Sequence, residues 1–105
     1  EIQFDGLDSE CELFVCYINN RPVGSARLYK NKVGRVATLK EYRKKGVARE
    51  IMKYIESYAK SKGIKELKLN AQLYVKDVYL KCGYKAIGDI FQEAKIDHIK
   101  MIKSL

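Results

Sequence analysis

The chain has 105 residues, 47% hydrophobic and 32% charged, and its 21 lysines and arginines exceed its 13 acidic residues to give a formal net charge of +8. This composition predicts one globular domain, residues 1–105, and argues against disorder. No run approaches the roughly 18 apolar residues of a membrane-spanning helix, so we expect a cytoplasmic protein with no membrane partner. Three cysteines without a CxxC pair favour free thiols over disulfides or a metal site.

The first half of the chain predicts three strands and a helix. Residues 1–10 carry four acids and a glycine and are expected to be an irregular lead-in. CELFVCYIN (11–19) and VGSARLYKN (23–31) are rich in strand-forming residues and flank the turn NNRP, so they predict a β-hairpin. Residues 32–39 predict a third strand. From residue 47 to 59 apolar residues recur at helical spacing, which predicts an amphipathic helix that ends at Gly63.

The second half predicts another strand, a short helix and a second hairpin. Residues 65–72 (KELKLNAQ) alternate as a strand does, and a right-handed crossover through the long helix makes this strand parallel to 32–39. A short helix at about 75–82 ends at Gly83, and residues 84–91 and 96–103 alternate around QEAK. The predicted fold class is therefore α/β, with a mixed, mostly antiparallel sheet, a central parallel strand pair, a hairpin at each end and two main helices.

The most informative segment is YRKKGVA (42–48), which lies between a strand and the long helix. Glycine allows backbone to approach a ligand closely, and the first amides of a helix have no intrahelical acceptors. Cations lie within this turn and beside it: Arg43, Lys44, Lys45, Lys40 and Arg49. Because cations oppose the dipole at a helix N-terminus, we interpret the turn as an anion site rather than an ordinary basic helix start. Taken alone, it could hold a nucleotide, nucleic acid or sulfate.

Several motifs occur in one order along the chain. Arg43, Gly46 and Ala48 have the spacing RxxGxA; LNAQ (69–72) and VYLKCGYKAIG (78–88) follow, and the tail is FQEAKIDHIKM (91–101). Together these segments resemble the GNAT superfamily of acyl-CoA-dependent N-acetyltransferases, and the tail is similar to its ElaA-like branch. The resemblance covers most of the chain from Cys11 onward. The family's usual N-terminal strand and helices are expected to be missing.

The resemblance implies that an acetyl group passes from acetyl-CoA to a primary amine of a small molecule or protein, by direct transfer in a ternary complex and without a metal. It implies cofactor contacts from these residues: Val36, Ala37, Thr38, Leu39, Arg43, Lys44, Lys45, Gly46, Val47, Ala48, Asn70, Tyr79 and Lys81. A backbone amide near Leu39 would polarise the thioester carbonyl. Tyr79 would be the general acid for the departing thiolate of coenzyme A; alternatively, it packs a helix face.

Other assignments stay open at this point. The general base is Glu41, Glu93, His98 or a water molecule, and the amine acceptor is unknown. Asn70 either contacts the cofactor or marks an edge or a bulge. If the family's first elements are missing, a homo-oligomer could cover the exposed face, or the chain could be a non-catalytic CoA-binding module without an acceptor site. Nucleic acid, another partner for a basic chain, is disfavoured because no aromatic residues interleave with a basic face.

Overall fold

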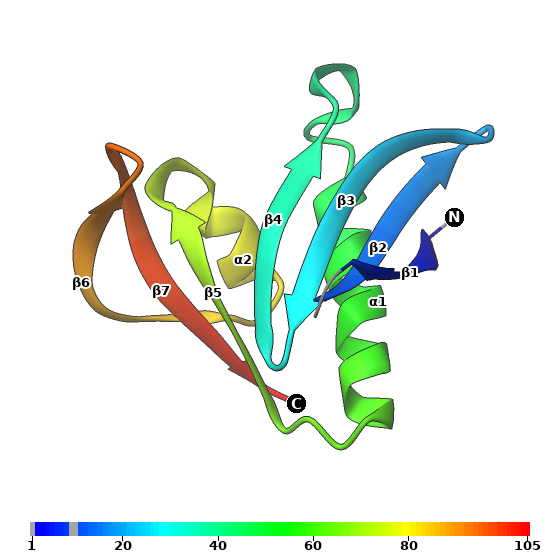
Figure 1. Ribbon diagram of the computed structural model, residues 1–105. Coiled ribbons are helices and arrows are strands. Elements are labelled where there is room, and N and C mark those ends of the chain that lie inside the picture. The colour runs from blue at the N-terminus through cyan, green and yellow to red at the C-terminus, as the bar shows by residue number, and fades with distance from the viewer. Residues whose placement is uncertain (1, 9–10) are drawn as a thin grey trace.

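The computed structural model describes residues 2–8 and 11–105, which form one seven-stranded sheet with two helices against it (Figure 1). The elements are β1 (Ile2–Asp8), β2 (Cys11–Ile18), β3 (Arg21–Tyr29), β4 (Lys32–Thr38), α1 (Val47–Ser61), β5 (Glu66–Gln72), α2 (Lys76–Lys81), β6 (Lys85–Glu93) and β7 (Ile96–Ser104). Two 3-10 helices, η1 (Lys40–Tyr42) and η2 (Leu73–Val75), precede α1 and α2. The strand order is β1-β2-β3-β4-β5-β7-β6, with only β4 and β5 parallel. The predicted fold class is confirmed.

The amino-terminal segment corrects one prediction. Residues 2–8 were expected to be irregular, but they form β1, which pairs antiparallel with β2 and places Asp8 opposite Cys11. The acidic residues and the glycine have low strand propensity and therefore did not predict a strand. Strand propensity depends on context, and pairing with β2 outweighs it here. Residues 1, 9 and 10 lie outside the described part of the chain, and no helix precedes β2 within the described ranges.

Local sequence signals explain the other element boundaries. Asn19 and Asn20 have φ of 51° and 63°, as in the type I′ turns that suit the twist of a two-residue hairpin. The helix α1 ends just before Gly63, whose φ of 79° is the left-handed conformation expected there. Its apolar stripe is buried against the sheet. The described residues contain no helix that is long and apolar enough to span a membrane, and all three cysteines are free.

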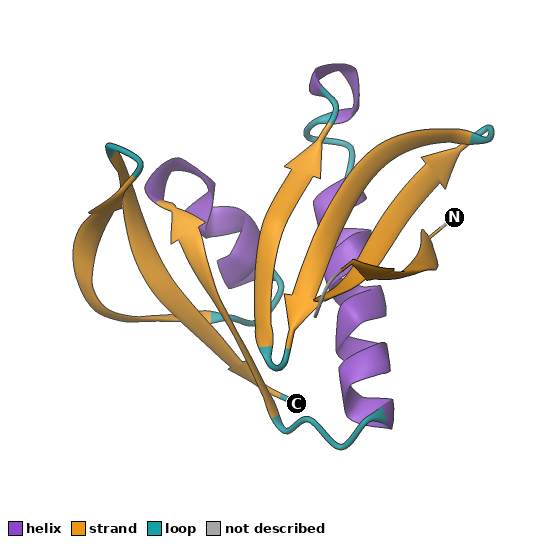
Figure 2. Cartoon of the chain, in the orientation of Figure 1, coloured by secondary structure: helices purple, strands orange, loops and turns teal. Residues whose placement is uncertain are grey.

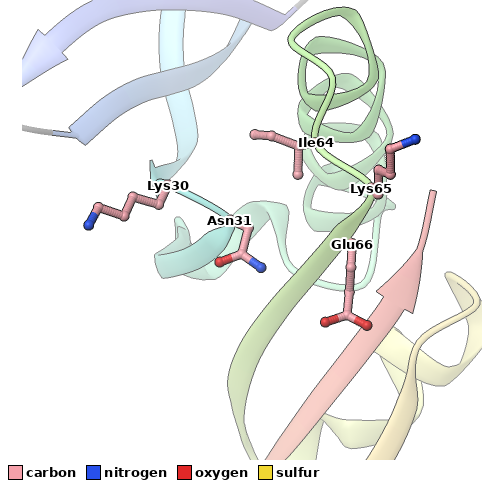
Figure 3. A pocket seen from close by; sticks show the side chains of 5 residues that line it. All are labelled: Lys30, Asn31, Ile64, Lys65 and Glu66. Carbon is pink, nitrogen blue, oxygen red and sulfur yellow. The ribbon is translucent and has the colours of Figure 1, made fainter.

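The parallel strands β4 and β5 meet only where they begin. Lys32 and Lys68 are their one bridge partner pair, and the Lys68 N–H donates to the carbonyl of Asn31 at 3.0 Å. Beyond this bridge the strands diverge, as Figure 2 shows. At the closed end a shallow depression is lined by Lys30, Asn31, Ile64, Lys65 and Glu66 (Figure 3). The expected parallel pair is therefore present, but it is opened into a V.

Candidate active site

The open arm of β4 carries a bulge. Arg35 and Val36 together face the single residue Ala26 of β3, and Arg35 has a φ of 50°. Beyond the bulge, the Leu39 N–H donates to the carbonyl of Val23 at 2.8 Å. Because backbone groups alternate along a strand, Thr38 turns its N–H and C=O away from β3, towards the opening. The Leu39 amide is thus already used, and the outward amides near it belong to Thr38 and, by the same alternation, Val36.

The turn after β4 leads into a helix without a side-chain cap. Gly46 is the N-cap of α1, with a φ of 81°, and no side-chain hydrogen bond caps this end. The first helical bond runs from the Glu50 N–H to the Gly46 carbonyl at 3.0 Å, so the amides of residues 47–49 have no acceptor within the helix. A Cβ built on Gly46 would meet nothing within 4 Å. The space beside Gly46 is therefore open.

Side chains brace the turn from the start of β3. Arg21 pairs with Glu41 at 3.2 Å, and its guanidinium lies 5.8 Å from the centre of the Tyr42 ring, which Lys45 also approaches at 5.6 Å. Arg43 Nε donates to the Thr38 carbonyl at 3.4 Å. A backbone hydrogen bond, and then Arg21, lower the pKa of Glu41. An ionised carboxylate held by an arginine is a poor general base, which argues against Glu41 in that role.

A glycine in β3 sets how closely α1 approaches the sheet. A Cβ built on Gly24 would lie 2.7 Å from Val47 Cγ1 and 3.1 Å from both the Ala37 carbonyl oxygen and Ile51 Cδ1. Val47 is the first residue of α1 and Ala37 lies in β4. Any larger residue at position 24 would therefore push the first turn of α1 away from β4. This strand leads into residues 43–46, which we call the anion turn together with the free amides of residues 47–49 that follow it.

Tyr79 is buried on the helix side of the sheet. Its side chain belongs to α2, only 6% of the residue is exposed, and its ring meets Tyr84 edge to face with centroids 6.0 Å apart. Burial, with a smaller contribution from Cys82, raises the pKa of Tyr79 to about 12. The phenol is therefore protonated throughout the neutral range, and it is roughly a thousandfold weaker acid than an ordinary thiol.

Asn70 lies on the other face of the sheet. Its strand neighbours Leu69 and Ala71 are buried in the core cluster that also contains Tyr79, so the Asn70 side chain points away from the helices. Asn70 pairs regularly with Lys100 of β7, which excludes a bulge there, but it lies beyond the bridge to β4. Asn70 and Tyr79 can reach one ligand only through the opening between β4 and β5. Lys81 is exposed at the end of α2.

The remaining base candidates lie together in the β6–β7 hairpin. His98 is 5% exposed and stacks on Phe91, with ring centroids 5.9 Å apart. Its Nδ1 lies 2.8 Å from the Ile96 carbonyl and its Nε2 lies 3.6 Å from Glu93 Oε2. The Nδ1 contact with the Ile96 carbonyl and the stack on Phe91 hold the ring, while Glu93 lies beyond hydrogen-bond distance of Nε2. Such contacts suit a structural histidine.

Sequence reasoning missed the contribution of Arg21 and Gly24 to this site, and it included Tyr42 in the turn without its contacts. A glycine inside a strand pattern is a known signal for close backbone approach, and it could have identified Gly24. Arg21 gave no comparable signal, because its contacts with Glu41 and Tyr42 cross about twenty positions of sequence. Such long-range contacts become visible only once the strands are paired.

A family model and a curated relative both match this chain and indicate the same family. A family model described as "Acetyltransferase (GNAT) domain" matches residues 2–105. The uncharacterized N-acetyltransferase YjcF of Bacillus subtilis (strain 168) is 35% identical over 108 residues, which cover 98% of this chain and 77% of YjcF. Both matches span nearly the whole chain, so they rest on the complete pattern of elements rather than on the RxxGxA turn alone.

Solved structures share the fold. Escherichia coli ElaA superposes with a TM-score of 0.81 at 23% identity, over 94% of this chain and 72% of ElaA. A GNAT family acetyltransferase from Elizabethkingia anophelis, solved with acetyl-CoA bound, has a TM-score of 0.78 at 18% identity, over 92% of this chain and 78% of that one. At these identities the likeness concerns the fold.

Proposed function

The chain belongs to the GNAT acetyltransferase family and is an acyl-CoA-dependent acetyltransferase; from this premise we propose that it transfers the acetyl group of acetyl-CoA directly to a primary amine of a small molecule or protein. The observation that carries the proposal is the V between β4 and β5, with an uncapped helix N-terminus at its open end. The three free cysteines suit a reducing compartment, and we place the protein in the cytoplasm.

The anion turn would hold the pyrophosphate of the cosubstrate. The free amides of Val47 and Ala48, together with that of Arg49, point along the axis of α1, where its dipole favours negative charge. Lys44 is exposed within the turn and has a φ of 63°. Basic side chains and free amides with open space around Gly46 fit a doubly charged phosphate group, and they explain why several cations are tolerated at a helix start.

The bulged part of β4 would activate the acetyl group. The outward N–H of Thr38 or Val36 donates to the thioester carbonyl oxygen, and this bond strengthens as negative charge develops there. The amine nitrogen forms a bond to the carbonyl carbon, the carbon–sulfur bond breaks, and the amine proton passes to water. Acetyl-CoA supplies the activated acyl group, while the chain supplies position and a preorganised donor. Asn70 would contact the pantetheine amides through the opening.

Tyr79 would act on the departing sulfur. Its phenol is a weaker acid than a thiol, so its contribution is a hydrogen bond donated to the thiolate as charge accumulates. The sulfur is then protonated by the proton that water took from the amine. A raised pKa keeps this donor protonated at every working pH. This hydrogen bond requires the Tyr79 hydroxyl to lie close to the sulfur, and it does not require a low pKa of the phenol.

Binding and turnover are tested separately. Calorimetry with acetyl-CoA at moderate salt is expected to show one site per chain, and release of the free thiol of coenzyme A is expected with at least one member of a panel of primary amines. Absence of binding would remove the proposed function. Binding without thiol release for any amine would favour the alternative, a CoA-binding module without an acceptor site.

The role of Tyr79 is tested by Tyr79→Phe. We expect turnover to fall roughly 10- to 100-fold, with the dissociation constant of acetyl-CoA unchanged within about twofold. Tyr74→Phe is the matched control, because Tyr74 precedes the same helix and is 79% exposed. Unchanged turnover in Tyr79→Phe would remove this residue from the mechanism.

A further inference from the structure

One lysine joins three elements on the helix side of the sheet. Lys103 of β7 donates from Nζ to Glu56 Oε1 of α1 at 2.8 Å and to the carbonyl oxygen of Cys82, which follows α2, at 2.6 Å. The same ammonium lies 5.8 Å from the centre of the Tyr84 ring. The side chains of Lys103 and Glu56 are 26% and 13% exposed. This is a shielded ion pair with a second, directed hydrogen bond.

The end of α2 is shaped to receive this lysine. Gly83 has a φ of 94°, and a Cβ built on it would lie 3.2 Å from Lys103 Cε and 3.3 Å from Lys103 Nζ. Carbonyls at a helix C-terminus lack intrahelical donors, and the Lys103 ammonium supplies one to Cys82. Glycine at position 83 thus ends the helix and leaves the space through which Lys103 reaches it.

The two helices differ in how firmly the core holds them. The helix α1 spans 15 residues and buries five of them in the core. The helix α2 has six residues and buries only Tyr79. Short helices have little stability of their own, so α2 depends on contacts at its ends. The bond from Lys103 to Cys82, three residues beyond Tyr79, is such a contact, and Glu56 anchors the lysine to the firmer helix.

We propose that Lys103 and Glu56 are positioning residues that fix α2, and with it the Tyr79 hydroxyl, relative to α1 and the opening between β4 and β5. The proposal rests on the proposed function, in which Tyr79 donates to the departing thiolate. Lys103 acts through the backbone of α2 and touches no reacting atom. Because the anion turn belongs to α1, loss of Lys103 is expected to alter turnover and to leave acetyl-CoA binding in place.

The test compares Lys103→Met with the control Lys85→Met, which removes an exposed lysine from β6 and changes the net charge equally. We expect Lys103→Met to lower kcat about tenfold while KM and the dissociation constant of acetyl-CoA stay within about twofold. Lys85→Met is expected to leave all three unchanged. Equal kcat values for the two variants would overturn the proposal, and so would a loss of binding as large as the loss of kcat.

A second variant keeps the test valid if Lys103→Met folds poorly. Removing the lysine alone leaves the Glu56 carboxylate shielded and unpaired, which destabilises the fold for reasons unrelated to Tyr79. Glu56→Gln/Lys103→Met removes both charges, and we expect it to show the same fall in kcat with a native thermal transition. Full kcat in this folded double variant would overturn the proposal.

A double-mutant cycle separates this proposal from the one it rests on. Lys103→Met added to Tyr79→Phe is expected to lower kcat by less than about twofold further, because the group it positions is already gone. If Tyr79→Phe alone keeps full turnover, the assignment of Tyr79 fails, and the positioning role fails with it. If Tyr79→Phe is slow but Lys103→Met lowers kcat equally in both backgrounds, only the positioning role is overturned.

Discussion

The two arms of the V are built in different ways. On one side, β2, β3 and β4 are covered by α1, which buries a continuous apolar stripe and carries the anion turn at its start. On the other side, β5, β7 and β6 are accompanied by α2, a helix of six residues with one buried side chain. Anion binding thus depends on a helix that packing alone can hold. The position of the Tyr79 hydroxyl depends on α2, which buries little apolar surface and relies on polar contacts such as the bond from Lys103 to Cys82.

The largest expected difference between the arms appears at alkaline pH. Burial raises the pKa of Tyr79 to about 12 and raises that of Tyr84 as well, so the folded protein retains protons that the unfolded chain releases above about pH 10. Stability is complete below pH 10 and is lost as pH rises towards 12, with Tyr79 contributing on the order of 2–3 kcal/mol. Thermal unfolding between pH 9 and 12 measures this loss, and Tyr79→Phe is expected to reduce it. An identical pH dependence in Tyr79→Phe would contradict the assignment.

Gly24→Ala tests the arm that carries α1. The added methyl group would overlap Val47 Cγ1, so we expect a loss of about 2 kcal/mol in the free energy of unfolding, together with weaker acetyl-CoA binding. Gly34→Ala is the control, because a Cβ there meets nothing within 4 Å. Denaturant titration and calorimetry give the two quantities. If Gly24→Ala lowers stability and leaves the affinity for acetyl-CoA unchanged, the position of the first turn of α1 does not determine how the anion turn binds its ligand.

Gly46→Ala and Gly88→Ala form a matched pair across the two arms. Both glycines have positive φ, 81° and 75°, and neither has an atom within 4 Å of the added methyl group. Each substitution is therefore expected to cost about 1 kcal/mol of stability through backbone conformation alone. Only Gly46→Ala is expected to weaken acetyl-CoA binding, by roughly five- to tenfold, because it tilts the free amides. Equal affinities in the two variants would place the anion elsewhere.

The smallest expected effect concerns the ion pair that braces the anion turn. Arg21 and Glu41 are 54% and 60% exposed, and exposed pairs contribute little. We expect Arg21→Met to shift the free energy of unfolding by less than about 1 kcal/mol, whereas Lys103→Met is expected to cost more. Denaturation midpoints of the two variants measure the contrast. If Arg21→Met lowers the free energy of unfolding more than Lys103→Met does, the polar contacts matter more in the arm of α1 than in the arm of α2, which contradicts the comparison.

Local signals in the sequence account for most of the fold. The hairpin around Asn19 and Asn20, the long helix that ends before Gly63 and the parallel pair flanking that helix all follow from turn residues, periodicity and crossover handedness. The strand β1 was missed because its two aspartates and its glycine have low strand propensity, and its pairing with β2 supplies the stabilisation. Propensity reports what a segment prefers alone, and edge pairing overrides it.

The site was predictable where its residues are adjacent in sequence. Residues 43–46 form the turn and residues 47–48 begin α1, so the site is one continuous segment, and the RxxGxA spacing identified it. The divergence of β4 and β5 after a single bridge, the use of the Leu39 amide by Val23 and the contacts of Lys103 all depend on pairing between distant segments. In the sequence, Lys103 cannot be distinguished from a solvated lysine of an alternating strand. Its role becomes visible only in the structure, where its side chain lies against Gly83 at the end of α2.

Because β4 and β5 are joined by the single bridge between Lys32 and Lys68, each has an unpaired edge inside the sheet, in addition to the edges of the outermost strands. Beyond that bridge, amides on the facing sides of β4 and β5 lack a ladder partner across the V, so we expect them to exchange hydrogen with solvent faster than amides that are paired in a ladder. A molecule that lies along the opening would slow this exchange from Thr38 and Asn70 inwards. Amide exchange at these two strands, compared with that of β2 and β3, would therefore report occupancy residue by residue without requiring turnover.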